Sequence, residues 1–180
     1  MSTAKLKKYL NAFEADINHT LMHSPKFEES VIIPKALPLE VQKWIRIKDI
    51  AAVYIDLVDS SAIDFVLHPK SSAMIYELFI GSLVDSLDLF DVDYIDIQGD
   101  GVLAIWAGKH SCVKAFLAVV SFRTLCRLSI SPRIKKKTND NISIECRSGL
   151  NHGQTIVKRI GIRGEKNKEV WAFKTVNKTV

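Results

Sequence analysis

The stretch VYIDLVDSS, residues 53–61, decides how this sequence is interpreted. It has the pattern of a buried β-strand of apolar and aromatic residues, interrupted by one carboxylate, Asp56. Burying an unpaired carboxylate costs several kcal/mol, so a strand keeps one only where another group pairs with it. Asp56 therefore marks a candidate functional site.

The chain as a whole has the composition of a globular protein. Its 180 residues are 47% hydrophobic and 25% charged, with a formal net charge of +5. This length suits one domain, and this charge allows an anionic ligand without indicating nucleic acid. No apolar run reaches the ~18–20 residues of a membrane span, and the Lys-rich start lacks a signal-peptide core. Cys112, Cys126 and Cys146 lack metal-ligand spacing, so we expect reduced thiols in a cytoplasmic protein without membrane contact.

Residues 1–46 are expected to form an N-terminal helical extension. Apolar residues at helical spacing predict an amphipathic helix over residues 4–22, whose apolar face we expect to pack on the domain or on a second subunit. Residues 23–38 contain three prolines and indicate a connector, and a short helix is expected around residues 39–46.

From Ile47 the pattern changes to that of an α/β domain over residues 47–180. The expected strands are 48–57, 92–97, 102–107, 143–151, 155–162 and about 168–173. The expected helices are 61–87, broken near His68-Pro69, then 109–128 and a start near Thr175, with a basic loop over 131–141. The turn Gln98-Gly99-Asp100-Gly101 is typical of a hairpin. This order predicts a ferredoxin-like, mostly antiparallel sheet with helices on one face.

In such a sheet Asp56 and Asp100 project from neighbouring strands at the same end. With no His or Cys nearby, oxygen ligands indicate Mg²⁺ or Mn²⁺ rather than zinc. Residues 57–61 then enter a helix whose first N–H groups would face the same place and could bind an anion. Together these features predict a metal–polyphosphate site. Taken alone, Asp59-Ser60-Ser61 is also a plain N-cap, and Asp100 a plain turn residue.

Four ordered motifs in residues 48–180 resemble the class III nucleotidyl cyclase catalytic domain of adenylate and guanylate cyclases. They are VYIDLVDSS, DIQGDGVLAIW, RSGLNHGQTIVKRIG and WAFKTVNKTV, similar to F-A-D-[IL]-V-G-[FS]-T, I-G-D, R-x-G-[IL]-x-x-G and V-N. The resemblance implies an antiparallel homodimer with active sites at its interface. It also implies cyclisation of a nucleoside triphosphate with two divalent metal ions, Mg²⁺ or Mn²⁺.

The resemblance assigns a role to individual residues. The metal ligands would be Asp56, Asp100 and the backbone carbonyl of Leu57, and the triphosphate would be held by the amides of Asp59, Ser60 and Ser61 and by Arg147. Asn177, from the other subunit, would orient the ribose. The family's transition-state arginine and phosphate-binding lysine would lie after Asn177, so either the chain is truncated at Val180 or the protein lacks both cations.

The expected base pocket differs from that of the purine cyclases. Asp96 and Val170 stand where adenylate cyclases have a lysine and an aspartate that contact adenine, and neither can replace the missing contact. Tyr54 and Phe173 are larger than the family's usual residues and would fill the pocket, although aromatic residues in strands also serve as core. The sequence is therefore similar to the pyrimidine cyclases of the bacterial Pycsar antiphage system, whose cyclic UMP or cyclic CMP activates a separate effector.

We expect UTP ahead of CTP as the substrate, with a purine triphosphate as the alternative. Two other classes stay open on the sequence alone. One is a catalytically silent cyclase-homology module that dimerises or binds a nucleotide. The other is a nucleic-acid-binding protein that uses the basic segment RIKKKTNDN, although its strands lack the paired aromatics that stack on bases. We therefore expect no nucleic-acid partner.

Overall fold

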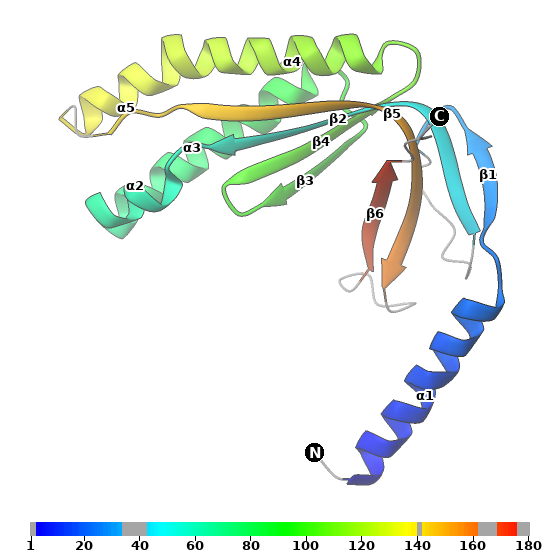
Figure 1. Cartoon of the computed structure of the whole chain (residues 1–180). Coiled ribbons are helices and arrows are strands. Elements are labelled where there is room, and N and C mark those ends of the chain that lie inside the picture. Colours follow the sequence, from blue (N-terminus) through cyan, green and yellow to red (C-terminus); the bar gives the residue numbers. More distant parts are fainter. Residues whose placement is uncertain (1–2, 34–42, 140–141, 162–168, 176–180) are drawn as a thin grey trace.

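The structure is a computed structural model that describes residues 3–33, 43–139, 142–161 and 169–175 (Figure 1). A sheet of six strands has the order β3-β4-β2-β5-β6, with β1 also paired to β2. The strands are β1 (Lys26–Ser30), β2 (Lys43–Leu57), β3 (Tyr94–Gln98), β4 (Gly101–Ala107), β5 (Cys146–Gly161) and β6 (Glu169–Thr175). The helices are α1 (Thr3–Met22), α2 (Ser60–Val66), α3 (Pro69–Asp88), α4 (Ser111–Leu125), the π-helical segment η1 (Cys126–Ile130) and α5 (Ser131–Lys137).

The main core lies between the sheet and helices α3 and α4, which cover one of its faces (Figure 1). Side chains alternate along β2, so Val53 and Ile55 point into this core while Tyr54 and Asp56 point to the opposite face. The two helices meet through Phe79 and Phe122, whose ring centroids are 5.4 Å apart in an edge-to-face contact. The predicted mostly antiparallel sheet with helices on one face is confirmed.

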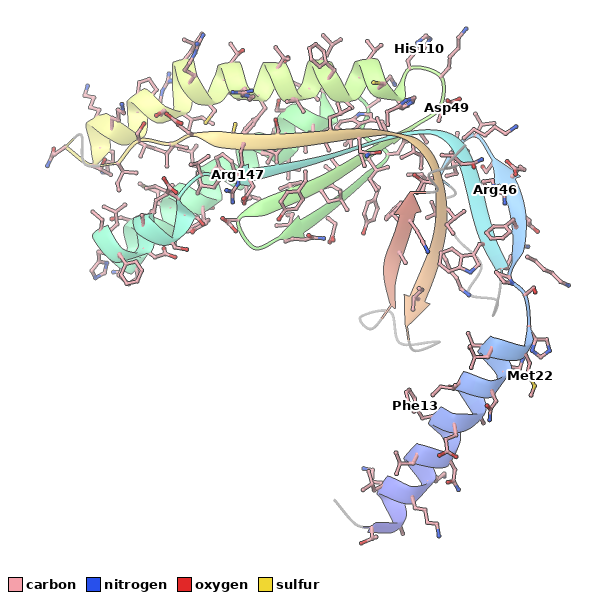
Figure 2. The ribbon with its side chains drawn as sticks, viewed as in Figure 1. Phe13, Met22, Arg46, Asp49, His110 and Arg147 are labelled. Atoms are coloured by element: carbon pink, nitrogen blue, oxygen red, sulfur yellow. The ribbon has the colours of Figure 1, made fainter. Side chains whose placement is uncertain are left out.

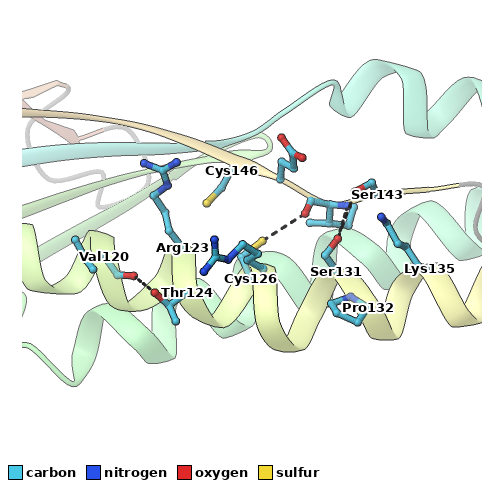
Figure 3. Close-up of a pocket in the computed structure, with 12 residues that line it drawn as sticks. Val120, Arg123, Thr124, Cys126, Ser131, Pro132, Lys135, Ser143 and Cys146 are labelled. Carbon is cyan, nitrogen blue, oxygen red and sulfur yellow. Dashed lines mark hydrogen bonds between the residues drawn. The ribbon is translucent and has the colours of Figure 1, made fainter.

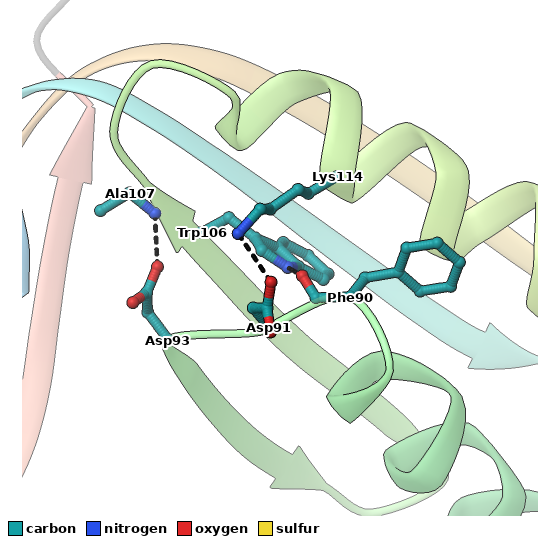
Figure 4. Close-up of polar contacts among 6 residues, drawn as sticks. All are labelled: Phe90, Asp91, Asp93, Trp106, Ala107 and Lys114. Atoms are coloured by element: carbon teal, nitrogen blue, oxygen red, sulfur yellow. Dashed lines mark hydrogen bonds and ion pairs between the residues drawn. The ribbon is translucent and has the colours of Figure 1, made fainter.

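The segment between α3 and β3 is fixed to β4 and α4 by polar contacts (Figure 4). The buried Trp106 donates from Nε1 to the carbonyl of Phe90 at 2.9 Å, and the amide of Ala107 donates to Oδ2 of Asp93 at 2.7 Å. Lys114 of α4 forms an ion pair with Asp91 at 3.0 Å. These contacts hold the β3–β4 hairpin in place at the end opposite to its turn.

The sheet curls sharply where β2 and β5 leave the main core (Figure 1). Between Ile47 and Ile50 the pairing of β2 with β5 shifts register, and such a bulge bends the strand. Beyond this bend a second, smaller cluster forms on the face opposite α3 and α4, around Ile47, Ile105 and Val157. The curl therefore creates a second packed region that positions β6.

Several expected boundaries were wrong in the N-terminal third. The short helix expected around residues 39–46 is not formed over residues 43–46, which already belong to β2, and residues 34–42 lie outside the described part. The connector over 23–38 contains β1, which pairs in parallel with the start of β2. These residues form strand because β2 offers them an edge with free backbone groups. The division at residue 46 into extension and catalytic domain stays a prediction.

Three segments after α4 also differ from expectation. The basic segment expected as a loop over 131–141 begins with the helix α5, which has Pro132 in its first turn. The two strands expected to flank His152-Gly153 are one continuous strand, β5, because Gly153 pairs with Ile50 of β2. The expected helix start near Thr175 is wrong at that residue, where β6 ends, and the following residues lie outside the described part.

Helix α1 is formed as expected and extends away from the sheet (Figure 1). Its apolar stripe stays exposed, from 40% at Ile17 to 80% at Leu21. Packing of this stripe on a second subunit stays a prediction. None of the helices in the described residues combines the length and the hydropathy needed to cross a bilayer.

Candidate active site

Asp56 lies between β4 and β5, opposite Gly101 on one side and Arg147 on the other. The Arg147 guanidinium donates to Oδ2 of Asp56 from Nε at 2.9 Å and from Nη2 at 2.6 Å. Asp56 is only 9% exposed, whereas the Arg147 side chain is 71% exposed and sits at the far end of the sheet from β6 (Figure 2). The partner that Asp56 requires is thus Arg147, and the hydrogen bond and charge of Asp56 raise the pKa of Arg147.

Asp100 joins this pair from the β3–β4 turn, directly before Gly101. A hydrogen bond with the Ser60 side chain lowers the pKa of Asp100, and its own backbone amide, Asp56 and the charge of Arg147 add to this effect, against a smaller opposing effect of burial. Asp100 is therefore a carboxylate at neutral pH. Asp56 and Asp100 lie at the same end of the sheet, as expected, but Asp100 belongs to the turn that leads into β4 and not to a strand.

The residues present suit a hard divalent cation. Asp56 and Asp100 offer carboxylate oxygens side by side, and oxygen ligands are what Mg²⁺ and Mn²⁺ prefer. Leu57 is 1% exposed with its side chain in the core, so only its backbone carbonyl could serve as a ligand. Within the described residues no group of three or more His, Cys, Asp or Glu side chains could hold a metal. A metal here would depend on two carboxylates, backbone oxygen and oxygens of a bound substrate.

The turn between β2 and α2 is shaped by Asp59, whose φ of 53° lies in the left-handed region. The cyclase motif quoted above has glycine at this position, and glycine adopts this conformation most readily. Asp59 occupies the N-cap position of α2, but its side chain makes no capping hydrogen bond. The amides of Ser60 and Ser61 open α2, where a helix offers its first N–H groups no internal acceptor.

Two of the expected base-pocket residues, Tyr54 and Asp96, lie on the same open face of the sheet. Asp96 of β3 is opposite Leu103 of β4, and Leu103 is opposite Tyr54 of β2, so their side chains form one cross-strand row. Asp96 accepts a hydrogen bond from Nε2 of Gln98 at 2.8 Å, which orients its carboxylate. The sequence analysis assigned Gln98 only to the hairpin turn and did not predict its contact with Asp96, although its position two residues after Asp96 places it on the same face.

Tyr54 and Phe173 each pack on a further residue, and neither of these packing contacts was predicted from the sequence. The Tyr54 ring lies across the backbone of Gly101, where an added Cβ would be 2.6 Å from its Cζ. Phe173 of β6 packs on Tyr94 of β3, with ring centroids 5.1 Å apart. Tyr94 and Asp96 share one face of β3, so Phe173 approaches the row from the curled end of the sheet.

Two expected site residues cannot be placed in full. Val170 lies in β6 opposite Ile160, and only its backbone belongs to the described part. Asn177 lies outside the described residues. Their expected roles stay predictions.

Solved structures of similar fold include nucleotidyl cyclases and a related ATP-binding protein. The guanylyl cyclase Cya2 superposes with a TM-score of 0.61 at 17% identity, over 72% of this chain and 64% of that one. A class III adenylyl cyclase-like ATP-binding protein from Pseudomonas aeruginosa gives 0.66 at 15% identity, over 92% of this chain and 37% of that one. The chain has the fold of the class III nucleotidyl cyclases.

Curated relatives of this cyclase-fold chain carry a more specific name. A protein of Micromonospora echinofusca named uridylate cyclase is 31% identical over 180 residues, covering 98% of this chain and 59% of its own length. A protein of Burkholderia cepacia with the same name is 26% identical over 148 residues, covering 82% and 64%. The chain thus spans about 60% of the length of these relatives. No family model matches it. The resemblance to class III cyclases, and among them to the pyrimidine cyclases, is confirmed.

Proposed function

We propose that this chain is a nucleotidyl cyclase domain that converts UTP to 3′,5′-cyclic UMP and pyrophosphate. The observation that carries the proposal is the pair of carboxylates, Asp56 of β2 and Asp100 of the β3–β4 turn, at one end of a sheet with the class III cyclase fold. The name uridylate cyclase of relatives that align over nearly the whole chain supports uracil as the base. A catalytically silent cyclase-homology module has less support, because both aspartates of the cyclase motifs are present and lie close together.

In the proposed reaction the 3′-hydroxyl of the ribose attacks the α-phosphate in line and pyrophosphate leaves. Asp56, Asp100 and the carbonyl of Leu57 would hold two divalent ions. When bound, these ions acidify the hydroxyl and neutralise the triphosphate. The chain contributes positioning and charge, which dominate catalysis of phosphoryl transfer.

Arg147 is proposed to exchange partners when the substrate binds. Its guanidinium is exposed to solvent, although Nε and Nη2 both donate to Asp56. Because the guanidinium is not enclosed in a pocket, it can turn toward an incoming phosphate. A guanidinium fork matches phosphate oxygens as well as carboxylate oxygens. The amides of Asp59, Ser60 and Ser61 would hold other phosphate oxygens at the start of α2.

The proposed base pocket selects uracil by size and by hydrogen bonding. Tyr54 and Phe173 restrict the space that a purine would need, and Val170 offers no acceptor for the adenine amino group. Asp96, oriented by Gln98, can accept the N3–H of uracil. Cytosine could donate its amino group to Asp96 instead, so hydrogen bonding to Asp96 does not separate UTP from CTP. We place UTP first because the relatives are named uridylate cyclase.

The working unit is proposed to be a homodimer in which Asn177 of one chain orients the ribose bound by the other. As in the Pycsar systems that the sequence resembles, we propose that the product acts as a messenger for a separate effector in antiphage defence. The enzyme would act in the cytoplasm.

The experiment is incubation of the purified protein with UTP and Mn²⁺, followed by chromatography. Wild type is expected to form cyclic UMP and pyrophosphate in equal amounts, while Asp56→Asn and Asp100→Asn form neither. Both variants keep the shape of the side chain, but they remove its charge and replace one acceptor oxygen by an NH2 donor. Folding is checked by circular dichroism. Turnover at the wild-type rate in either folded variant would overturn the assignment of the metal residues.

A further inference from the structure

A cavity of about 630 Å³ lies on the helix side of the molecule, away from the candidate active site (Figure 3). One wall is a single face of the continuous helix α4–η1–α5, with lining residues spaced four apart at Arg123, Arg127, Ser131 and Lys135. The other wall is formed by residues 143–145 and by Cys146, the first residue of β5. A cavity of this size is typical of small-molecule sites.

The charge of the lining is unbalanced. Three cations, Arg123, Arg127 and Lys135, face one carboxylate, Glu145. Within the part of the chain that the structure describes, none of these three cationic side chains forms a hydrogen bond or an ion pair. Arg123 and Arg127 are four residues apart on the helix, where like charges repel each other, so an anion bound between them would relieve this repulsion.

Polar contacts join the two walls of the cavity and fix the distance between them. The Ser131 hydroxyl, on a residue that is 8% exposed, accepts the amide of Ile144 at 3.1 Å and lies 3.5 Å from the Ser143 hydroxyl. Cys126 donates to the Ile144 carbonyl across the same gap at 3.8 Å. The helix at this point is π-helical, and such turns occur frequently at functional sites.

Cys146 and Arg147 separate this cavity from the candidate active site. Consecutive residues of a strand point to opposite faces, so Cys146 lines the cavity while Arg147 pairs with Asp56. A ligand in the cavity would therefore not compete with a nucleoside triphosphate for the same groups.

We propose that this cavity is a second binding site and that it takes a small organic phosphate. Arginine forks bind phosphate oxygens with two parallel hydrogen bonds, and the lysine adds a third charge. Val120 and Pro132 supply apolar surface for the organic part of the ligand. The proposal does not depend on the cyclase activity, because binding is measured without a nucleotide.

The test is a titration of the full chain with phenyl phosphate at constant ionic strength, followed through the arginine Nε–Hε signals in NMR spectra. Arg123 and Arg127 are expected to shift with one saturable curve, while Arg133, on α5 but outside the cavity, stays unchanged. Lys135→Gln should weaken binding about tenfold, the effect of losing one charge-assisted hydrogen bond. Lys136→Gln, which removes a charge from the next residue of the same helix, should leave the affinity unchanged.

The titration also has results that overturn the proposal. A shift confined to Arg147 would mean that phosphate binds only at the candidate active site. Equal weakening by Lys135→Gln and Lys136→Gln would mean that the anion senses only the overall charge of α5. Weaker binding of phenyl phosphate than of inorganic phosphate would overturn the assignment of an organic ligand.

Discussion

Replacing Gly101 by alanine tests whether the packing of the Tyr54 ring on the backbone of β4 shapes the base pocket. A Cβ at Gly101 would lie 2.6 Å from Cζ and 3.0 Å from Cε1 of Tyr54, against an ordinary contact of 3.4–4 Å. The ring must therefore move by about 1 Å. Because Tyr54 is 39% exposed, the ring can move toward solvent, and we expect an unfolding free energy lower by only about 1 kcal/mol.

The effect of Gly101→Ala on turnover is expected to be much larger than its effect on stability. A displacement of about 1 Å in a substrate-positioning group can reduce the rate about a hundredfold. We therefore expect kcat/KM for UTP to fall between tenfold and a hundredfold on that basis. Urea unfolding measures the first quantity and initial rates of cyclic UMP formation measure the second.

Gly149→Ala is the matched control, because Gly149 lies on the other side of Tyr54 in the sheet. An added Cβ there meets nothing within 4 Å, so both stability and turnover should stay near wild type. Equal kcat/KM values for the two alanine variants would refute the role given to the Gly101–Tyr54 contact.

Three further predictions concern the carboxylates and the partners of the site. Ser60→Ala should raise the pKa of Asp100, measured by ¹³C NMR, while Ser61→Ala leaves it unchanged. Because folding lowers the pKa of Asp100, the Asp100 carboxylate stabilises the folded chain at pH values above its pKa in the unfolded chain. This stabilisation is lost as the pH falls through the pKa of the folded chain. Ser60→Ala should therefore shift the loss of stability to higher pH. Mixing inactive Asp56→Ala and Asn177→Ala chains should restore part of the activity if each site uses both subunits, and no recovery in mixed dimers would contradict this. Arg147→Lys keeps the charge but loses the fork, so KM for UTP should rise about tenfold, and an unchanged KM would argue against a phosphate contact.

The sequence predicted those parts of the fold whose signals are local. The hairpin turn at Gly99 and the helix break at Pro69 were found because each depends on a few neighbouring residues. The edge strand β1 was missed because its exposed residues, KFEES, show no alternation, and its strand character comes from pairing with β2. Helix α5 was missed because its lysines suggested a solvated loop, although Pro132 in the first turn is a helix-start signal.

The two carboxylates of the candidate site could be predicted from the sequence, but the residues that contact them could not. Asp56 stood out because a buried strand cannot keep an unpaired charge. Its direct partner, Arg147, is 91 residues away, and nothing in the sequence indicates that the two bind each other before a triphosphate is present. The contact of Ser60 with Asp100 likewise depends on how α2 meets the β3–β4 turn, which only the folded chain defines.

Competition among the four nucleoside triphosphates tests the central claim most directly. The purified chain is incubated with equimolar ATP, GTP, CTP and UTP and with Mn²⁺, and the cyclic products are separated by chromatography. A pocket narrowed by Tyr54 and Phe173, with Asp96 as acceptor, predicts that cyclic UMP predominates and that cyclic CMP comes second. A predominant peak of cyclic AMP or cyclic GMP would contradict this account of the pocket.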